Sequence, residues 1–189
     1  RHTRYIGDWS SDVCSSDLDR LVRDEVVPGS EWVLAGEGVA TRKWDGTSCL
    51  VRSGELWRRY DARKGRTPPE GFQPAQAPDP VTGHHPGWLP VGEGPDDAYH
   101  REAWAAAGQA LPDGTYELIE PKVQGNPEGV PTHRLVPHGQ DTLPDAPREY
   151  TALRAYLEAR PDMEGIVWHH PDGRMVKLKR KDFFGSRRR

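Results

Sequence analysis

The chain lacks any long apolar stretch. Nowhere in its 189 residues do eighteen apolar residues follow one another, and no basic start leads into an apolar run of the kind that signal peptides carry. Transmembrane helices and secretory leaders are both defined by such runs. We therefore expect a soluble, cytoplasmic protein that makes no membrane contact.

Cysteine is scarce as well. The two cysteines, Cys14 and Cys49, are too few for a disulfide framework, and no spacing of Cys and His matches a zinc site. This excludes the small disulfide-stapled and zinc-stapled classes of domain.

The histidines include two adjacent pairs, His84-His85 and His169-His170. Neighbouring side chains on a strand point to opposite faces, so the two members of a pair do not readily bind one ion. We expect structural or surface roles for both pairs.

A strong net charge is also absent. The chain has 26 Lys and Arg against 29 Asp and Glu, a formal charge of −3, which excludes a uniformly basic protein. The basic residues gather instead at the end of the chain: "VKLKRKDFFGSRRR", Val176 to Arg189, holds seven of them against one acidic residue. We interpret the final three arginines as a solvated tail, and the segment as a whole suits contact with a phosphate backbone.

The first eighteen residues differ from all that follows. "RHTRYIGDWSSDVCSSDL" is rich in Ser and Asp and has neither a helical nor an alternating period. It closely resembles the peptide that results when sequencing-adapter DNA is translated at the start of a metagenomic reading frame. We set residues 1–18 aside as an artefact outside the fold and expect the natural amino terminus to be missing.

The rest of the chain, 19–189, has the length of a single domain. Short apolar runs from Glu31 onward predict a β-meander with a hairpin turn at Ser53-Gly54. "TYELIEPKVQG" predicts a further strand, and "EGIVWHHPDGRMVKLKRKDFF" predicts two strands joined by Pro171-Asp172-Gly173.

Helices are expected in two places. Asp96-Asp97 offers an amino-terminal cap to "AYHREAWAAAGQAL", and a second helix is expected from about Arg148 to Arg160. Eight prolines between Pro68 and Pro95 predict a long surface loop over about 67–95. Antiparallel strands interrupted by two helices give an α+β fold.

One lysine stands in an otherwise strand-like, apolar run. In "ATRKWDGTSCLV", Ala40 to Val51, Lys43 precedes the sharp turn Asp45-Gly46. A lone lysine on a strand is usually solvated, but a second lysine-bearing strand, "VKLKRK", lies near the far end of the domain. Lys177 and Lys179 are two residues apart, so they share one face of that strand while Leu178 faces the core.

"KWDGT" resembles the K-x-D-G motif of the covalent nucleotidyltransferases, which include ATP-dependent DNA and RNA ligases and mRNA-capping guanylyltransferases. "YELIE", "EGIVW" and "VKLKRK" resemble the family's third, fourth and fifth motifs, in the family's order. With "LWRRYDARKG", "YELIEPKVQGNPEG" and "RLVPHG", the chain most resembles small single-domain ATP-dependent RNA ligases over nearly all of Glu31 to Phe184. The resemblance implies a nucleotidyltransferase domain of two antiparallel sheets flanked by helices, with the nucleotide between them.

The resemblance also implies roles for single residues. Lys43 is the nucleophile that forms a lysyl-AMP intermediate, and its amine must be neutral when it attacks, although the ordinary pKa of lysine is about 10.4. Nearby cations from Lys177 and Lys179 favour the neutral form and offset phosphate charge. Glu164 is expected to bind Mg²⁺ or Mn²⁺.

Glu117 matches the glutamate that contacts the ribose in relatives, with Glu120 as the competing candidate. Arg59 matches a basic residue that contacts the nucleotide or the 5′-phosphate, with Arg58 left open because it points the other way on a strand. Asp45 and Gly46 are expected to shape the loop, and Trp44 to pack away from the catalytic face. The residue that stacks on adenine stays unassigned, with "HRLVPHG" near the expected place.

The function expected is ATP-dependent joining of RNA 5′-phosphate and 3′-hydroxyl ends, by a monomer that uses ATP and Mg²⁺. The alternatives are a DNA nick-sealing ligase or a capping guanylyltransferase. Both usually carry an oligonucleotide-binding barrel after the fifth motif, whereas ten residues follow Lys179 here. A catalytically inactive RNA-binding module is the alternative of another class.

Overall fold

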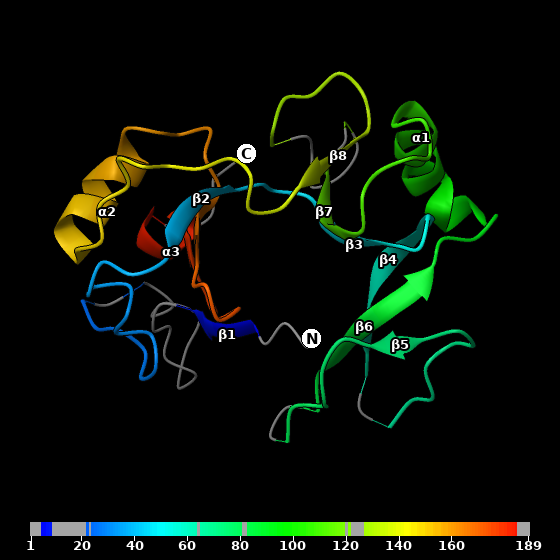
Figure 1. Cartoon of the computed structure of the whole chain (residues 1–189), viewed down its shortest axis with the longest axis horizontal. Coiled ribbons are helices and arrows are strands. Elements are labelled where there is room, and N and C mark those ends of the chain that lie inside the picture. Colours follow the sequence, from blue (N-terminus) through cyan, green and yellow to red (C-terminus); the bar gives the residue numbers. More distant parts are fainter. Residues whose placement is uncertain are drawn as a thin grey trace. The chain divides into compact units, whose positions relative to one another are not determined.

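The structure, a computed structural model, describes residues 5–8, 22, 24–63, 65–80, 83–119, 121 and 127–184, with the backbone alone for 5–8. It is α+β, with two largely antiparallel sheets and few helices (Figure 1), which confirms the expected fold class at this level. Contacts divide the chain into two compact units, one formed by Asp45–His138 and the other by Arg4–Trp44 with Gly139–Arg189. That both belong to one domain remains a prediction.

The unit Asp45–His138 is built on a six-stranded antiparallel sheet. Its strand order is β5-β6-β4-β3-β7-β8. The strands are β3 (Thr47–Arg52), β4 (Glu55–Ala62), β5 (Gln73–Pro74), β6 (His85–Pro90), β7 (Gly114–Ile119) and β8 (Arg134–Pro137). The helix α1 (Ala98–Ala106) follows the short 3-10 turn η1 (Pro95–Asp97) and packs against β4 and β8.

One face of this sheet forms the unit's apolar core. Its buried side chains alternate along the strands and pack with α1; they are Cys49, Val51, Leu56, Tyr116 and Leu118, together with Ala103 of the helix. Because side chains alternate along a strand, the residues between them, such as Ser48 and Glu117, stand on the opposite face of the sheet.

The other unit is built on a four-stranded sheet in the order β1-β10-β9-β2. Strands β2 (Val39–Lys43), β9 (Gly165–His169) and β10 (Met175–Lys179) pair antiparallel, and β1 (Tyr5–Asp8) pairs parallel with β10. Strand β1 falls in the segment that the sequence analysis set aside from fold reasoning. The helices α2 (Tyr150–Glu158) and α3 (Arg180–Phe184) pack against each other, and α3 follows β10 directly.

One face of this second sheet is also largely apolar, with Arg42 at the end of β2 as its charged residue. It packs against the two helices through Ala40, Ile166, Trp168, Val176, Leu178, Leu153, Leu157 and Phe183, none more than 7% exposed. Each fully buried side chain of this size contributes about 2 kcal/mol, so the strand register is strongly fixed. A slip of one residue would bury the charged side chains of the opposite face.

Both predicted turns are present. Ser53 (φ 53°) and Gly54 (φ 76°) both have positive φ, as the tight hairpin turn between β3 and β4 requires. The turn Pro171-Asp172-Gly173 joins β9 to β10, with Gly173 at φ 92°. The predicted helix near 148–160 is confirmed as α2, which buries Leu153 and Leu157 completely.

The expectation of a loop over about 67–95 is wrong for β6, which contains two of the prolines. Strand β6 pairs with β4 through six residues, including Pro86 and Pro90. The Pro86 carbonyl accepts from the backbone N–H of Ala75, so the hydrogen-bonding side of Pro86, and of Pro90 four residues on, faces the short strand β5. Neither proline removes a bond from the long ladder with β4.

The predicted meander does not begin at Glu31. Residues 31–36 form turns in which backbone N–H groups donate three to five residues back, for example Val33 to Ser30 and Glu37 to Trp32. Gly36 (φ 87°) and Gly38 (φ 73°) then redirect the chain, and β2 starts only at Val39. Residues 31–36 therefore form local hydrogen bonds with helix-like spacing in place of the strand that their composition predicted.

The predicted cap position of the first helix is confirmed, but its side-chain bond does not form. Asp97 stands at the cap position of α1 but its side chain makes no cap hydrogen bond. One oxygen of Asp97 instead accepts from the Gly92 N–H at 2.7 Å and the other pairs with Arg58 at 2.8 Å. The partly buried guanidinium of Arg58 competes for this carboxylate more strongly than a helix N–H does.

Among the described helices, none has the length and apolar character that crossing a bilayer demands.

Candidate active site

Two of the predicted catalytic lysines lie in one row across three strands. Lys43, at the end of β2, and Lys179, at the end of β10, both pair with Gly165 on the strand β9 that runs between them. Residues paired across antiparallel strands point to the same face, so both lysines leave the sheet on its polar side. Thr41, Val167 and Lys177 form the next row on that face.

Glycine is required at position 165 because there is no room for a side chain, not because of an unusual backbone conformation. A Cβ atom at this position would lie 2.0 Å from the backbone oxygen of Leu178, closer than any real contact. The backbone of β10 thus lies directly against Gly165. Because glycine has no side chain, none stands between Lys43 and Lys179 in this row. This explains the glycine of "EGIVW" physically.

Lys43 forms an ion pair with Glu164. The Nζ atom of Lys43 donates to Oε2 of Glu164 at 2.5 Å, and the two side chains are only 20% and 16% exposed. Glu164 immediately precedes β9, so the pairing of β2 with β9 brings together residues far apart in the chain. The nucleophile and the metal ligand predicted from the sequence are therefore in direct contact.

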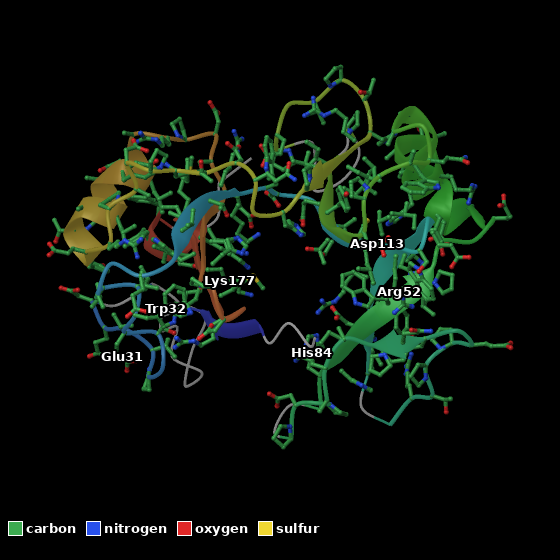
Figure 2. The ribbon with its side chains drawn as sticks, viewed as in Figure 1. Glu31, Trp32, Arg52, His84, Asp113 and Lys177 are labelled. Carbon is green, nitrogen blue, oxygen red and sulfur yellow. The ribbon has the colours of Figure 1, made fainter. Side chains whose placement is uncertain are left out.

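Lys177 and Lys179 share the polar face of β10, as their spacing predicts, while Leu178 is fully buried on the other face (Lys177 is labelled in Figure 2). Burial lowers the pKa of Lys179 below its usual value, and the positive charges of Lys177, Lys181 and Lys43 lower the pKa further. Glu164 acts in the opposite direction. Lys43, Glu164, Lys177 and Lys179 thus form one electrostatically linked group, called here the lysine cluster.

The turn Asp45-Gly46, which follows Lys43, packs closely against β7. A Cβ atom on Gly46 would lie 2.1 Å from the backbone oxygen of Leu118, so only glycine fits. The N–H of Gly46 donates to Oε1 of Glu117 at 3.1 Å, and the N–H of Asp45 donates to Oε1 of Glu128 at 2.8 Å. The glycine of the K-x-D-G motif therefore shapes the turn, as expected, and two carboxylates hold it.

Glu117 lies on the face of the six-stranded sheet opposite to the core and is 9% exposed. Its Oε2 lies 2.8 Å from Nε2 of His138, the residue that follows β8. Glu120, the competing candidate, lies outside the described residues. The sequence did not predict the roles of His138 and Glu128, because their contacts with Glu117 and Asp45 depend on how loops return to the sheet.

Arg58 and Arg59 point to opposite faces of β4, as strand alternation predicts. Arg58 lies on the core face and pairs with the buried Asp97. Arg59 lies on the same face as Glu117, pairs with Asp61 at 2.9 Å and places its guanidinium 5.8 Å from the ring of Trp88. The geometry favours Arg59 over Arg58 as a ligand contact, because the Arg58 charge is already used inside the unit.

The polar face near Lys43 also holds a histidine that the sequence analysis treated as structural. The Oγ1 of Thr41 donates to the backbone oxygen of Val167 at 3.1 Å and lies 3.0 Å from Nε2 of His169. His170 instead bonds Glu37, so neighbouring histidines take different partners. The Arg42 guanidinium lies over the ring of Trp44, with its Cζ atom 4.0 Å from the ring centroid.

The segment "HRLVPHG" does not supply an obvious stacking residue for adenine. His133 is buried, stacks on Tyr99 with ring centroids 4.5 Å apart and pairs with Glu102. Leu135 packs against the core, and His138 bonds Glu117. The assignment stays open.

Whether the site fits a metal ion depends on Glu164. Among the described residues, no group of three or more His, Cys, Asp or Glu side chains forms a cage for a metal. Mg²⁺ in nucleotide enzymes is typically held by one or two carboxylates together with phosphate oxygens and water, and Glu164 offers such a carboxylate. The donor set therefore fits a magnesium ion that arrives with a nucleotide.

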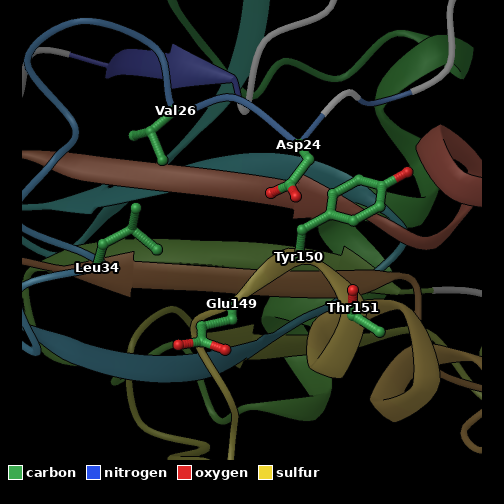
Figure 3. Close-up of a pocket in the computed structure, with 6 residues that line it drawn as sticks. All are labelled: Asp24, Val26, Leu34, Glu149, Tyr150 and Thr151. Atoms are coloured by element: carbon green, nitrogen blue, oxygen red, sulfur yellow. The ribbon is translucent and has the colours of Figure 1, made fainter.

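A surface pocket of about 280 Å³ lies elsewhere in the unit that contains Lys43 (Figure 3). Its lining residues are Asp24, Val26, Leu34, Glu149, Tyr150 and Thr151. None of them is a predicted site residue, so the pocket is separate from the lysine cluster.

The chain is similar to proteins named RNA ligase 1. The RNA ligase 1 family profile matches residues 94–186, a range that contains Glu117, Glu164, Lys177 and Lys179 but not Lys43. RNA ligase 1 of Mus musculus is 28% identical over 214 residues, covering 75% of this chain and 65% of the mouse protein. The Danio rerio protein of that name is 28% identical over 75% of this chain, and the Pongo abelii protein is 30% identical over 52% of it.

The chain spans about two thirds of the length of the mouse and fish relatives, 65% and 66% respectively. The matched range covers strand β7, which carries Glu117, strand β9, which Glu164 immediately precedes, and strand β10, which carries both later lysines. The profile and the relatives together show that the chain is similar to proteins named RNA ligase 1 over this range.

Proposed function

We propose that the protein is an ATP-dependent RNA ligase whose two sheets form a nucleotidyltransferase domain. The single observation that carries the proposal is the lysine cluster, in which the lysine of a K-x-D-G motif contacts Glu164 and shares a row with Lys179. Similarity to proteins named RNA ligase 1 supports the choice of RNA as substrate.

The first step is attack by Lys43. Its neutral amine attacks the α-phosphorus of ATP, a nitrogen–phosphorus bond forms, the bond to the β-phosphate oxygen breaks, and pyrophosphate leaves. Before the attack, the Lys43 ammonium group loses a proton to solvent water and its ion pair with Glu164 breaks. Lys177 and Lys179 would offset the charge that accumulates on the phosphate oxygens.

Two further transfers complete the reaction. An oxygen of the RNA 5′-phosphate attacks the AMP phosphorus, which frees Lys43 and gives an adenylylated RNA end. A 3′-hydroxyl then attacks the 5′-phosphorus, joins the strands and releases AMP. Each step is a phosphoryl-type transfer, so the residues contribute mainly by position and charge.

The other predicted residues act on binding. We expect Glu117 to contact the ribose and Arg59 to contact the nucleotide or the 5′-phosphate. Glu164 would hold Mg²⁺, which when bound offsets the repulsion between phosphate groups.

The experiment that tests the proposal supplies ATP, Mg²⁺ and a 5′-phosphorylated RNA, with the matching DNA in parallel. The proposal predicts that RNA ends are joined at least about tenfold faster than DNA ends. Faster joining of DNA would favour a nick-sealing DNA ligase, and labelling by GTP rather than ATP would favour a guanylyltransferase. RNA binding with no covalent nucleotide on the protein would favour an inactive binding module.

A further inference from the structure

His138, the histidine of "RLVPHG", is held to strand β7 by two hydrogen bonds, one of them to Glu117. His138 directly follows β8, and its backbone N–H donates to the backbone oxygen of Thr115 at 3.0 Å. Its Nε2 lies 2.8 Å from Oε2 of Glu117. Thr115 and Glu117 are two residues apart on β7, so the backbone and the side chain of His138 bond to the same strand at two positions.

The chemistry of the pair fixes the direction of the bond. An ionised carboxylate only accepts hydrogen bonds, so Nε2 of His138 must carry the proton and donate. The other oxygen of Glu117 accepts from Gly46 N–H at 3.1 Å, a longer bond than the one to His138. Each bonded oxygen still has one lone pair for a further donor, such as a sugar hydroxyl.

The two bonds together determine the orientation of the Glu117 carboxylate. With His138 removed, the longer bond to Gly46 would be the one left to restrain it among the described residues, and the carboxylate could rotate about its last side-chain torsion. The pair is well shielded, since the side chain of Glu117 is 11% exposed and that of His138 is 27% exposed. Hydrogen bonds to charged groups in such surroundings are among the stronger ones.

We propose that His138 is a positioning residue that orients Glu117 toward the ribose hydroxyls of ATP, and so sets the preference for a ribonucleotide. This inference rests on the proposed function, because it needs Glu117 to contact the sugar. It adds a residue and a selectivity that the motif comparison does not supply. His138 acts through Glu117 and does not itself touch the reacting atoms.

The test measures self-adenylation of the full chain with ATP and with 2′-deoxyATP. We expect His138→Ala to lower kcat/KM for ATP by at least about tenfold, mainly through KM, and to lower that for 2′-deoxyATP by less than about threefold. His138→Gln, which keeps an N–H donor at similar reach, should restore the preference to within about threefold. Glu117→Ala should lose the same preference, and adding His138→Ala to it should cause no further loss.

His85→Ala is the matched control, since the ring of His85 packs on Phe72 in the same unit with centroids 5.4 Å apart. The preference of His85→Ala for ATP over 2′-deoxyATP should equal that of the wild type. Unchanged preference in His138→Ala, with the wild type active, would overturn the inference and leave the proposed function standing. No adenylation by the wild type would overturn both.

A measurement on the wild type covers the case in which His138→Ala fails to fold. Nitrogen NMR should show His138 protonated at Nε2, and ATP should shift that resonance more than 2′-deoxyATP does. Equal shifts, or a proton at Nδ1 alone, would contradict the proposed contact.

Discussion

The ammonium group of Lys43 lies 2.5 Å from the Glu164 carboxylate, although the two residues are 121 positions apart in the chain. The pairing of β2 with β9 creates this contact, and both side chains are largely shielded from water. The contact joins the predicted nucleophile to the predicted metal ligand. It follows that a change at Glu164 should affect both folding and chemistry.

Glu164→Ala should slow formation of the protein–AMP adduct by at least about 100-fold, because it removes the carboxylate proposed to hold Mg²⁺. It should also reduce the free energy of unfolding by about 1–3 kcal/mol, because the shielded Lys43 loses a charged hydrogen-bond acceptor. Single-turnover labelling and urea denaturation measure the two effects. Glu164→Gln, which keeps an acceptor, should retain more of the stability and remain slow; full activity in this variant would argue against the metal role.

Gly46 and Gly165 should not tolerate alanine. The added methyl group would lie 2.1 Å from the Leu118 oxygen in the first case and 2.0 Å from the Leu178 oxygen in the second. Each substitution should lower the free energy of unfolding by at least about 2 kcal/mol, because strands must move apart. Gly94→Ala is the control, since no heavy atom lies within 4 Å of its Cβ position, and it should change stability by less than about 0.5 kcal/mol. Equal effects at all three glycines would count against this packing.

The neighbours Arg58 and Arg59 should give opposite results. Arg58→Met should reduce the free energy of unfolding by about 2 kcal/mol, because it leaves the buried Asp97 carboxylate without its cation, and KM for ATP should hardly change. Arg59→Met should change stability by less than about 1 kcal/mol, because its partner Asp61 is half exposed, and should raise KM for ATP about tenfold. The reverse outcome would assign the ligand contact to Arg58.

The depressed pKa of Lys179 predicts how stability depends on pH. Burial, then Lys177, Lys181 and Lys43, disfavour the charged form of Lys179 in the folded state. Between the folded and unfolded pKa values of Lys179, the unfolded chain binds more protons at this residue than the folded chain does. The free energy of unfolding therefore rises as the pH increases through this range toward the ordinary pKa of lysine.

Lys179→Met should therefore be more stable than the wild type at neutral pH, and the difference should shrink as the pH approaches 10. Urea denaturation across this range measures it. Lys179→Arg is the control, because arginine stays charged throughout and its cost should not disappear. A difference between Lys179→Met and wild type that stays constant with pH would contradict the assigned cause.

Local signals in the sequence were sufficient for much of the fold. The turn residues Ser53-Gly54 and the spacing of Leu153 and Leu157 specify their elements through contacts only a few residues apart. Strand β6 was missed because the effect of Pro86 and Pro90 depends on which neighbouring strand their backbone faces. The loss of the Asp97 side-chain cap was not predicted because its competitor, Arg58, comes from the distant strand β4.

The site shows the same division. Alternation along β10 was enough to place Lys177 and Lys179 on one face. The contacts of His138 with Glu117 and of Glu128 with Asp45 depend on long-range loop placement, for which the sequence has no periodic signal. The roles proposed for all of these residues await experiment.

The central claim is that the Lys43 amine becomes covalently bonded to AMP. The most direct measurement incubates the protein with ATP and Mg²⁺, digests it and examines the peptide containing Lys43 by mass spectrometry, with Lys43→Arg alongside. The account predicts an adenylyl group on Lys43 in the wild type, stable in alkali and labile in acid as a phosphoramidate is, and none on the variant. An unmodified Lys43 peptide, or an adduct that persists in Lys43→Arg, would contradict it.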